Sequence, residues 1–316
     1  MKKYKMVFAV LICLPVLSAW AGQWTYDSGS AELSHNTSGW VLAASRNGIN
    51  LTVTGVSQFP GTPSALPLSD PMPGYSLVSI GNNAFYCCTS LTSVTIPASV
   101  TSIGYRAFYD CTALATVTIP ASVTSIEVSA FSGCSGLTGI NVDTANMSYS
   151  STNGILFNKN QNTLIQYPCG KAGNYTIPNS VTSIGDRAFS DCTSLTSVLF
   201  TGGAPAIGSY VFAFTPATIY YLPGSTGWST TFGGRPTLLW NPAVQHDTAF
   251  GFAPNEFGFN ISGTANIPVV VEACTNLSFG VWTPLLTNTL DSSGALYFTD
   301  PSSTGHPARF YRIVWP

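Results

Sequence analysis

The sequence predicts a mainly β fold with short helical turns, organised as a solenoid and followed by a small antiparallel β module. Two observations predict it: a unit of 23 residues recurs through the middle of the chain, and longer alternating strands replace it near residue 250. One unit offers about seven apolar positions worth roughly 1.5 to 3 kcal/mol each, whereas ordering costs roughly 1 to 2 kcal/mol per residue. A single unit therefore cannot fold alone, and the units must stack.

The repeat unit is defined by residue types that return at fixed offsets. In the first copy these are Ile80, Gly81, Ala84, Phe85, Cys88, Leu91, Val94, Ile96, Pro97 and Val100. One period later they are Ile103, Gly104, Ala107, Phe108, Cys111, Leu114, Val117, Ile119, Pro120 and Val123. A third copy begins at Ile126, a fourth follows an interruption at Ile177, and a degenerate copy begins at Ile207. Equivalent side chains should therefore form ladders along the stack.

Each unit is predicted to contain a short strand, a turn, a second extended segment and one turn of helix. The alternation from Leu91 to Ile96 is typical of a strand, and Pro97 ends it because proline cannot donate to a sheet. Residues 83–87 are too few for more than one helical turn.

The repeat resembles the BspA-like (treponemal-type) leucine-rich repeat of bacterial surface and secreted proteins. The shared pattern is Val-x-x-Ile-Gly-x-x-Ala-Phe-x-x-Cys-x-x-Leu-x-x-Val-x-Ile-Pro, and it covers residues 77–222. The resemblance implies a right-handed leucine-rich-repeat solenoid. The interruption resembles a wider coil of the family that carries an inserted hairpin, here near residues 143–175. The resemblance also implies adhesion to host or matrix proteins.

Residues 1–21 are predicted to be a secretory signal peptide. Lysines open the segment, an apolar run follows, and Ala19-Trp20-Ala21 provides a small-x-small cleavage site. The apolar run is too short for a permanent anchor, and no later stretch reaches the ~20 apolar residues that a transmembrane helix requires. We therefore expect a secreted or cell-surface protein with no transmembrane segment after removal of the signal.

The charge balance argues against nucleic acid as a partner. The chain has 11 Lys and Arg residues against 13 Asp and Glu residues, and three of the lysines belong to the predicted signal. The remainder has a net charge of about −5, whereas nucleic acids and anionic membranes select clustered positive charge. The expected partner is an extracellular or envelope protein or glycan.

Two structural ladders are predicted from residues that share a repeat position. The ladder residues are Cys88, Cys111, Cys134 and Cys192, and Phe85, Phe108, Phe131 and Phe189. The favoured interpretation of the cysteines is a row of buried thiols that act as small apolar residues. Disulfides between neighbouring coils are the alternative in an oxidising compartment, because adjacent coils lie ~4.8 Å apart. A metal site is least favoured, since no histidine lies in the repeats.

The segments that flank the repeats have other patterns. Residues 22–76 alternate apolar and polar and then become rich in proline, as expected for a β cap over an open solenoid edge. Residues 223–249 hold the turn residues and aromatics of a C-terminal cap and linker. Residues 250–316 predict a small β-sandwich-like module. This module resembles those that end many exported proteins of environmental bacteria.

The sequence offers no recognisable catalytic constellation. It lacks the nucleophile elbow, the zinc-protease motif, the phosphate loop and the dinucleotide fingerprint. The three histidines, His35, His246 and His306, lie outside the repeats, and His246 beside Asp247 is better explained as a surface pair. We therefore expect no enzymatic activity, no cofactor and no metal.

The candidate contact surface is the outward side of the repeat strands. If Val94 and Ile96 point inward, the residues beside them point outward, because successive side chains in a strand alternate. The outward candidates for binding are Ser93, Thr95, Thr116, Thr118, Asn141 and Ser197. They form either a neutral contact face or an ordinary solvated sheet, where threonine is favoured anyway. The aromatic alternatives are Tyr86, Tyr105, Tyr109, Tyr149 and Tyr167.

Two functions follow from these patterns. The first is a non-enzymatic, exported, adhesin-like protein whose repeats bind a protein or glycan. The alternative is a structural or envelope-organising protein that is anchored by its C-terminal module and uses the repeats as a spacer. An aromatic row on the sheet would favour a glycan, and exposed aromatics confined to the module would favour the anchor.

Overall fold

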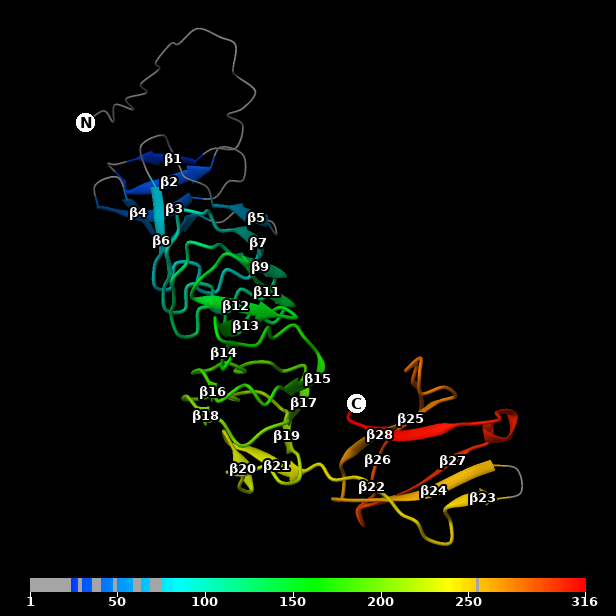
Figure 1. Ribbon diagram of the computed structural model, residues 1–316. Helices are drawn as coiled ribbons and strands as arrows, with labels where there is room; N and C mark the ends of the chain where they lie inside the picture. Colours follow the sequence, from blue (N-terminus) through cyan, green and yellow to red (C-terminus); the bar gives the residue numbers. More distant parts are fainter. Residues whose placement is uncertain are drawn as a thin grey trace, which may run out of the picture.

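The structure, a computed structural model, is an elongated solenoid with a small β module beside its last coils (Figure 1). The described residues are 24–27, 30–35, 41–47, 50–58, 64–68, 76–253 and 256–316. The predicted signal peptide, residues 1–21, lies outside them. Within the described residues, no helix is long and apolar enough to span a membrane.

Each coil contributes one strand to a row of parallel strands along one side of the solenoid (Figure 1). The first outer sheet consists of β5 (Ser64–Pro67), β7 (Leu91–Thr95), β9 (Thr116–Ile119) and β11 (Gly139–Val142). The second outer sheet consists of β15 (Gly173–Ile177), β17 (Leu195–Phe200), β19 (Thr218–Tyr221) and β21 (Arg235–Leu239), with β20 (Thr231–Phe232) antiparallel at its edge. Val94 pairs with Val117, one period away, so the sequence period sets the sheet register.

A second row of strands lies on the opposite side of the coils. It consists of β6 (Ser76–Ile80), β8 (Ser102–Ile103) and β10 (Ser125–Ile126), and then β14 (Thr163–Gln166), β16 (Ser183–Ile184) and β18 (Ala206–Ile207). The N-terminal strands are β1 (Trp24–Asp27), β2 (Glu32–His35), β3 (Val41–Asn47) and β4 (Asn50–Gln58). They pair antiparallel with one another, and β4 pairs parallel with β6. The edge of the first repeat is therefore covered by chain that precedes it.

The segment expected as one turn of helix is a run of consecutive turns in the structure. The amides of Ala84 and Tyr86 donate within the turn, to Gly81 (3.3 Å) and Asn83 (3.1 Å). The amide of Phe85, between them, donates instead to the carbonyl of Ala107 in the next coil at 2.7 Å. Half of the amides thus serve the neighbouring coil, which prevents a helical ladder. Among the described residues, the one assigned helix is the 3-10 turn η1 (Ser303–Gly305).

Stacked aromatic rings run through the core as predicted. Phe108 lies between Phe85 and Phe131, with ring centroids 5.1 and 5.4 Å away. Past the interruption, Tyr167 takes the phenylalanine position of the enlarged coil and stacks on Phe189 at 5.1 Å. All of these rings are buried, so the ladders form the continuous core of each half of the solenoid.

The interruption contains a hairpin formed by β12 (Tyr149–Thr152) and β13 (Ile155–Asn158). Its turn lies against the edge of β11, where the carbonyl of Gly154 accepts a hydrogen bond from the amide of Ile140 at 2.8 Å. Gly154 has a φ of +76°, and an added Cβ would lie 2.8 Å from Gly139 Cα. Glycine is therefore required at this point, and the hairpin separates the two outer sheets.

The C-terminal module packs two small antiparallel sheets face to face. One contains β22 (Ala243–Val244), β23 (Gly251–Ala253), β24 (Glu256–Ser262) and β27 (Ala295–Asp300). The other contains β25 (Pro268–Cys274), β26 (Thr283–Thr289) and β28 (Phe310–Val314). Phe259, Ile261, Val269, Val271 and Phe298 form the buried core between them.

Candidate binding surface

The first outer sheet presents a polar face to solvent. Ser93 of β7 pairs with Thr116 of β9, which pairs with Gly139 of β11, and Thr118 pairs with Asn141. Between these positions Val94 and Val117 are buried, so the strands alternate as predicted. The exposed polar residues Ser93, Thr95, Thr116, Thr118 and Asn141 are here called the open face.

The second outer sheet does not continue this open surface. Leu199, Tyr220 and Leu238 occupy neighbouring outward positions on β17, β19 and β21. Leu199 and Tyr220 are only 4% and 7% exposed, because both belong to the core cluster of the C-terminal module. The module thus covers this part of the sheet.

Ser197 is a correction to the predicted surface. It is only 7% exposed, and its hydroxyl is hydrogen-bonded to the side-chain oxygen of Asn174. Asn174 in turn donates from Nδ2 to the carbonyl of Pro316, the last residue of the chain, at 3.2 Å. The returning C-terminus therefore occupies the place where Ser197 was expected to face a partner.

The sequence itself indicates that the second outer sheet is covered whereas the first is open. The outward positions of the early strands hold Thr95, Thr118 and Asn141, whereas the corresponding later positions hold Leu199 and Tyr220. Large apolar residues at outward positions imply a cover, because soluble proteins rarely expose contiguous apolar patches. The repeat pattern alone does not say which segment provides that cover.

The predicted tyrosines divide into a surface group and a structural group. Tyr86 stacks on Tyr109 at 5.3 Å, and the Arg106 guanidinium lies over the rings of Tyr105 (4.9 Å) and Tyr109 (5.1 Å). Burial, followed by the charge of Asp191, raises the pKa of Tyr109. Tyr86, Tyr105, Arg106 and Tyr109 are here called the tyrosine patch.

The two tyrosines near the hairpin have structural roles. The Tyr149 hydroxyl accepts a hydrogen bond from the amide of Ile126 at 2.8 Å, which ties the hairpin to the preceding coil. Tyr167 is only 2% exposed and belongs to the ring ladder. Tyr167 therefore cannot contribute to an aromatic contact patch, whereas Tyr149, which is partly exposed, stays a prediction.

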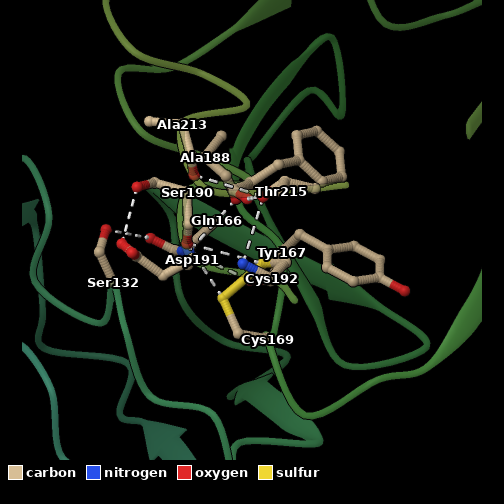
Figure 2. The surroundings of a disulfide bond; sticks show 11 residues. Ser132, Gln166, Tyr167, Cys169, Ala188, Ser190, Asp191, Cys192, Ala213 and Thr215 are labelled. Atoms are coloured by element: carbon tan, nitrogen blue, oxygen red, sulfur yellow. Dashed lines mark hydrogen bonds between the residues drawn. A yellow bond between two sulfur atoms is a disulfide. The ribbon is translucent and has the colours of Figure 1, made fainter. Parts of the chain in front are cut away.

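The cysteine ladder has two chemical states. Cys88, Cys111 and Cys134 are buried thiols, whereas Cys192 forms a disulfide with Cys169 at a Cα–Cα distance of 4.2 Å. Figure 2 shows this bridge surrounded by Gln166, Ser190 and Thr215. Cys169 was not assigned to the ladder from the sequence, although it lies 23 residues before Cys192. The separation of one repeat period could have identified this pair from the sequence.

The residue at the cysteine position of the repeat also makes a hydrogen bond. Sγ of Cys111 donates to the carbonyl of Phe85 at 3.2 Å, and Sγ of Cys134 donates to that of Phe108 at 3.0 Å. In the last coil, Thr215 occupies this position and donates its hydroxyl to the carbonyl of Phe189. The position therefore selects a small donor that satisfies a buried carbonyl of the preceding coil.

An aromatic cleft lies in the module, between β24 and β28. Phe257, Phe259 and Tyr311 line it, and its volume is about 440 Å³. Its two arginines are already paired, Arg309 with Asp300 and Arg312 with Glu272, each at 2.7 Å. His246 at its rim packs against Phe250 with the two rings tilted, their centroids 4.7 Å apart. Throughout the described residues, no group of three potential metal ligands gathers.

The comparisons with known proteins agree with the repeat architecture. Residues 72–168 and 160–228 match the family described as BspA type Leucine rich repeat region, in six copies. No curated protein matches the chain.

Solved bacterial structures resemble parts of the chain. A leucine rich cell surface protein of Faecalibacterium prausnitzii A2-165 is 34% identical over 49% of this chain, with a TM-score of 0.43. The match spans 40% of that protein's length. A leucine-rich repeat protein of T. pallidum is 24% identical over 63% of this chain and 88% of its own, with a TM-score of 0.36. A leucine-rich repeat protein of Eubacterium ventriosum ATCC 27560 is 20% identical over 59% of this chain and 70% of its own, with a TM-score of 0.33.

Proposed function

The chain belongs to the BspA-type leucine-rich-repeat family, and we propose that it binds a protein partner through its open face. The proposed contact is adhesin-like, takes place at the cell surface or outside the cell, and involves no catalytic step. Export through the N-terminal signal is part of this proposal.

The observation that carries the proposal is the difference between the outward side chains of the two outer sheets. Where the module packs permanently, these positions hold Leu199 and Tyr220. Where nothing covers the described sheet, they hold serine, threonine and asparagine. Polar side chains that keep their hydration in the free protein suit a reversible contact with direct and water-mediated hydrogen bonds.

A protein partner is favoured over a glycan. None of the described outward residues of β7, β9 and β11 is aromatic, so the open face offers no ring on which a sugar could stack. The backbone of the open face is instead a regular, rigid platform with side chains about 4.8 Å apart from strand to strand. Such a platform suits an extended protein surface.

The alternative function, anchoring by the C-terminal module, is supported by a different observation. The loop between β25 and β26 exposes three apolar residues, Leu277 (57%), Phe279 (80%) and Val281 (71%). Exposed apolar groups of this size mark contact sites in soluble proteins. In this alternative the loop contacts the envelope and the repeats act as a spacer.

The test measures binding of the full chain to immobilised fibronectin, laminin and bacterial envelope fractions by biolayer interferometry. Thr116→Arg combined with Thr118→Arg places two long charged side chains at the centre of the open face and should weaken matrix-protein binding at least tenfold. The matched control is Thr287→Arg on β26, an exposed strand threonine far along the chain. Point substitutions are preferred to deletion of the module, which would uncover Leu199 and Tyr220.

The outcomes separate the two functions. Matrix binding that survives both arginines on the open face would contradict the proposal, as would failure of the unaltered chain to bind either matrix protein. Binding to envelope material alone, lost in Leu277→Ser combined with Phe279→Ser, would establish the anchoring function instead.

A further inference from the structure

Three thiols form a continuous row through the first three repeats. Cys88, Cys111 and Cys134 are 1%, 0% and 0% exposed. Cys111 is the middle member, and its thiol donates to the carbonyl of Phe85 at 3.2 Å, while the thiol of Cys134 donates to that of Phe108 at 3.0 Å. Each of these two thiols therefore points toward the coil before it, so the three cysteines follow one another through adjacent coils.

The corresponding pair further along the same ladder is already oxidised. Cys169 and Cys192 are separated by 23 residues and joined by a disulfide. Cys88 and Cys111 are separated by the same 23 residues, as are Cys111 and Cys134. Cys88, Cys111 and Cys134 each lie three residues after a ladder phenylalanine, whereas Cys169 lies two residues after Tyr167. The Cys169–Cys192 bridge nevertheless shows that neighbouring coils of this solenoid come within the reach of a disulfide.

Backbone hydrogen bonds hold these neighbouring coils at the required spacing. The amide of Cys87 donates to the carbonyl of Tyr109 at 2.8 Å, just before Cys88 and Cys111. The amide of Asp110 donates to the carbonyl of Ser132 at 3.0 Å, just before Cys111 and Cys134. Coils that are paired in this way lie about 4.8 Å apart, within the Cα–Cα range of about 4.4 to 6.8 Å that a disulfide accepts.

We propose that this row takes up a second disulfide when the chain folds under oxidising conditions, and that Cys111 is always one of its two members. Cys111 pairs with Cys88 or with Cys134, and the two pairings exclude each other. Cys88 and Cys134 cannot pair directly, because two coil spacings amount to about 10 Å, beyond the reach of a disulfide. One thiol of the row therefore always stays reduced.

The oxidant is a low-molecular-weight disulfide such as oxidised glutathione, and it acts before the row is buried. A Cys111 thiolate attacks one glutathione sulfur, forms a mixed disulfide and releases one glutathione thiolate. A Cys88 or Cys134 thiolate then attacks the Cys111 sulfur and releases the second glutathione. Two protein thiols and one oxidised glutathione thus give one protein disulfide and two reduced glutathiones.

The test counts free thiols in the full chain after Cys13→Ser, Cys87→Ser and Cys274→Ala, which leave the five ladder cysteines. The protein is unfolded, reduced and refolded in a glutathione redox buffer, then denatured and alkylated with N-ethylmaleimide for intact mass and peptide mapping. We expect one free thiol, at Cys88 or Cys134, together with an intact Cys169–Cys192 bridge. Three free thiols, or a bridge between the row and Cys169 or Cys192, would overturn the proposal.

Single substitutions test the role of Cys111. In the same background, Cys111→Ser should leave two free thiols, whereas Cys88→Ser and Cys134→Ser should each leave none. If Cys111→Ser leaves no free thiol, Cys88 and Cys134 have paired with each other. That result would overturn the proposal that Cys111 is always a member of the second disulfide. Circular dichroism checks folding, and Cys111→Thr is the second variant because Thr215 already occupies this ladder position and keeps its hydrogen bond.

Discussion

The indole of Trp315 packs against the ring of Tyr220, with ring centroids 4.8 Å apart. Tyr220 lies on the outward side of β19 in the repeats, whereas Trp315 is the penultimate residue of the chain. Trp240 lies beside the same indole, 6.0 Å away, and donates its own indole N–H to the carbonyl of Pro268 at 2.7 Å. The module is therefore packed onto the last coils (Figure 1).

Replacing this indole should loosen the module from the repeats. Trp315→Ala is expected to lower the free energy of unfolding by about 2 kcal/mol, less than a fully buried tryptophan because Trp315 is partly exposed. Urea unfolding followed by circular dichroism measures the loss, and limited proteolysis should cut residues 240–250 faster. The control is Phe279→Ala, 80% exposed, which should change stability by less than about 0.5 kcal/mol. Equal effects of the two substitutions would contradict the docked arrangement.

The ring ladder should be the most sensitive part of the repeats. Phe108 contacts a stacked ring on each side and is fully buried. Phe108→Ala is therefore expected to cost about 4 kcal/mol, measured by urea unfolding. Tyr86→Ala removes a ring that also stacks but is 44% exposed, and it should cost less than about 1 kcal/mol. A small loss in Phe108→Ala would mean that the ladder does not stabilise the stack.

A side chain at Gly133, in the third coil, should destabilise the protein more than one at a glycine with open space around it. Gly133 has a φ of +75°, and an added Cβ would lie 1.9 Å from Oδ1 of Asp110. Gly224 has a similar φ of +79° with no atom within 4 Å, so Gly224→Ala should cost only the backbone strain of about 1 to 2 kcal/mol. Gly133→Ala should lower the stability more than Gly224→Ala does. Adding Asp110→Ala to the Gly133→Ala protein should remove this additional loss. Thermal unfolding of the four proteins checks this, and equal losses in both alanine variants would refute the steric account.

Alkaline pH should destabilise the fold through Tyr167. Burial raises the pKa of Tyr167 from its ordinary value of 10.0 to about 12. Above pH 10 the unfolded chain loses this proton while the folded chain keeps it, so stability falls by about 1.4 kcal/mol per pH unit until pH 12. Tyr167→Phe keeps the ring on Phe189 and should remove this part of the loss. Urea unfolding at pH 9, 10.5 and 11.5 compares the two proteins, and parallel declines would exclude Tyr167 as the cause.

The repeat period alone was sufficient to predict the stack and its ladders. Phe85, Phe108 and Phe131 recur every 23 residues, and the structure stacks their rings. The same period, applied to the enlarged coil, would also have paired Cys169 with Cys192. A residue one period away lies in the next coil, so the sequence reports these contacts directly.

The helical turn expected at residues 83–87 shows where local reasoning fails. The short segment has room for one helical turn, yet the amide of Phe85 donates to Ala107 in the next coil. That acceptor exists only once two coils have stacked. The choice between helix and consecutive turns was therefore made by the neighbouring coil, because an amide can serve only one strong acceptor at a time.

The sequence by itself determined the period, the alternation of inward and outward side chains in the repeat strands and the ladder residues of the regular coils. The tertiary structure alone decided that Ser93 faces solvent while Ser197, at a repeat-equivalent position, lies beneath the returning C-terminus. The contacts of Trp315 and Pro316 with the repeats join segments that share no period. Their positions depend on how the completed module packs against the apolar patch of the second outer sheet. Because the hydrophobic effect has no preferred direction, sequence spacing does not predict which segments it brings together.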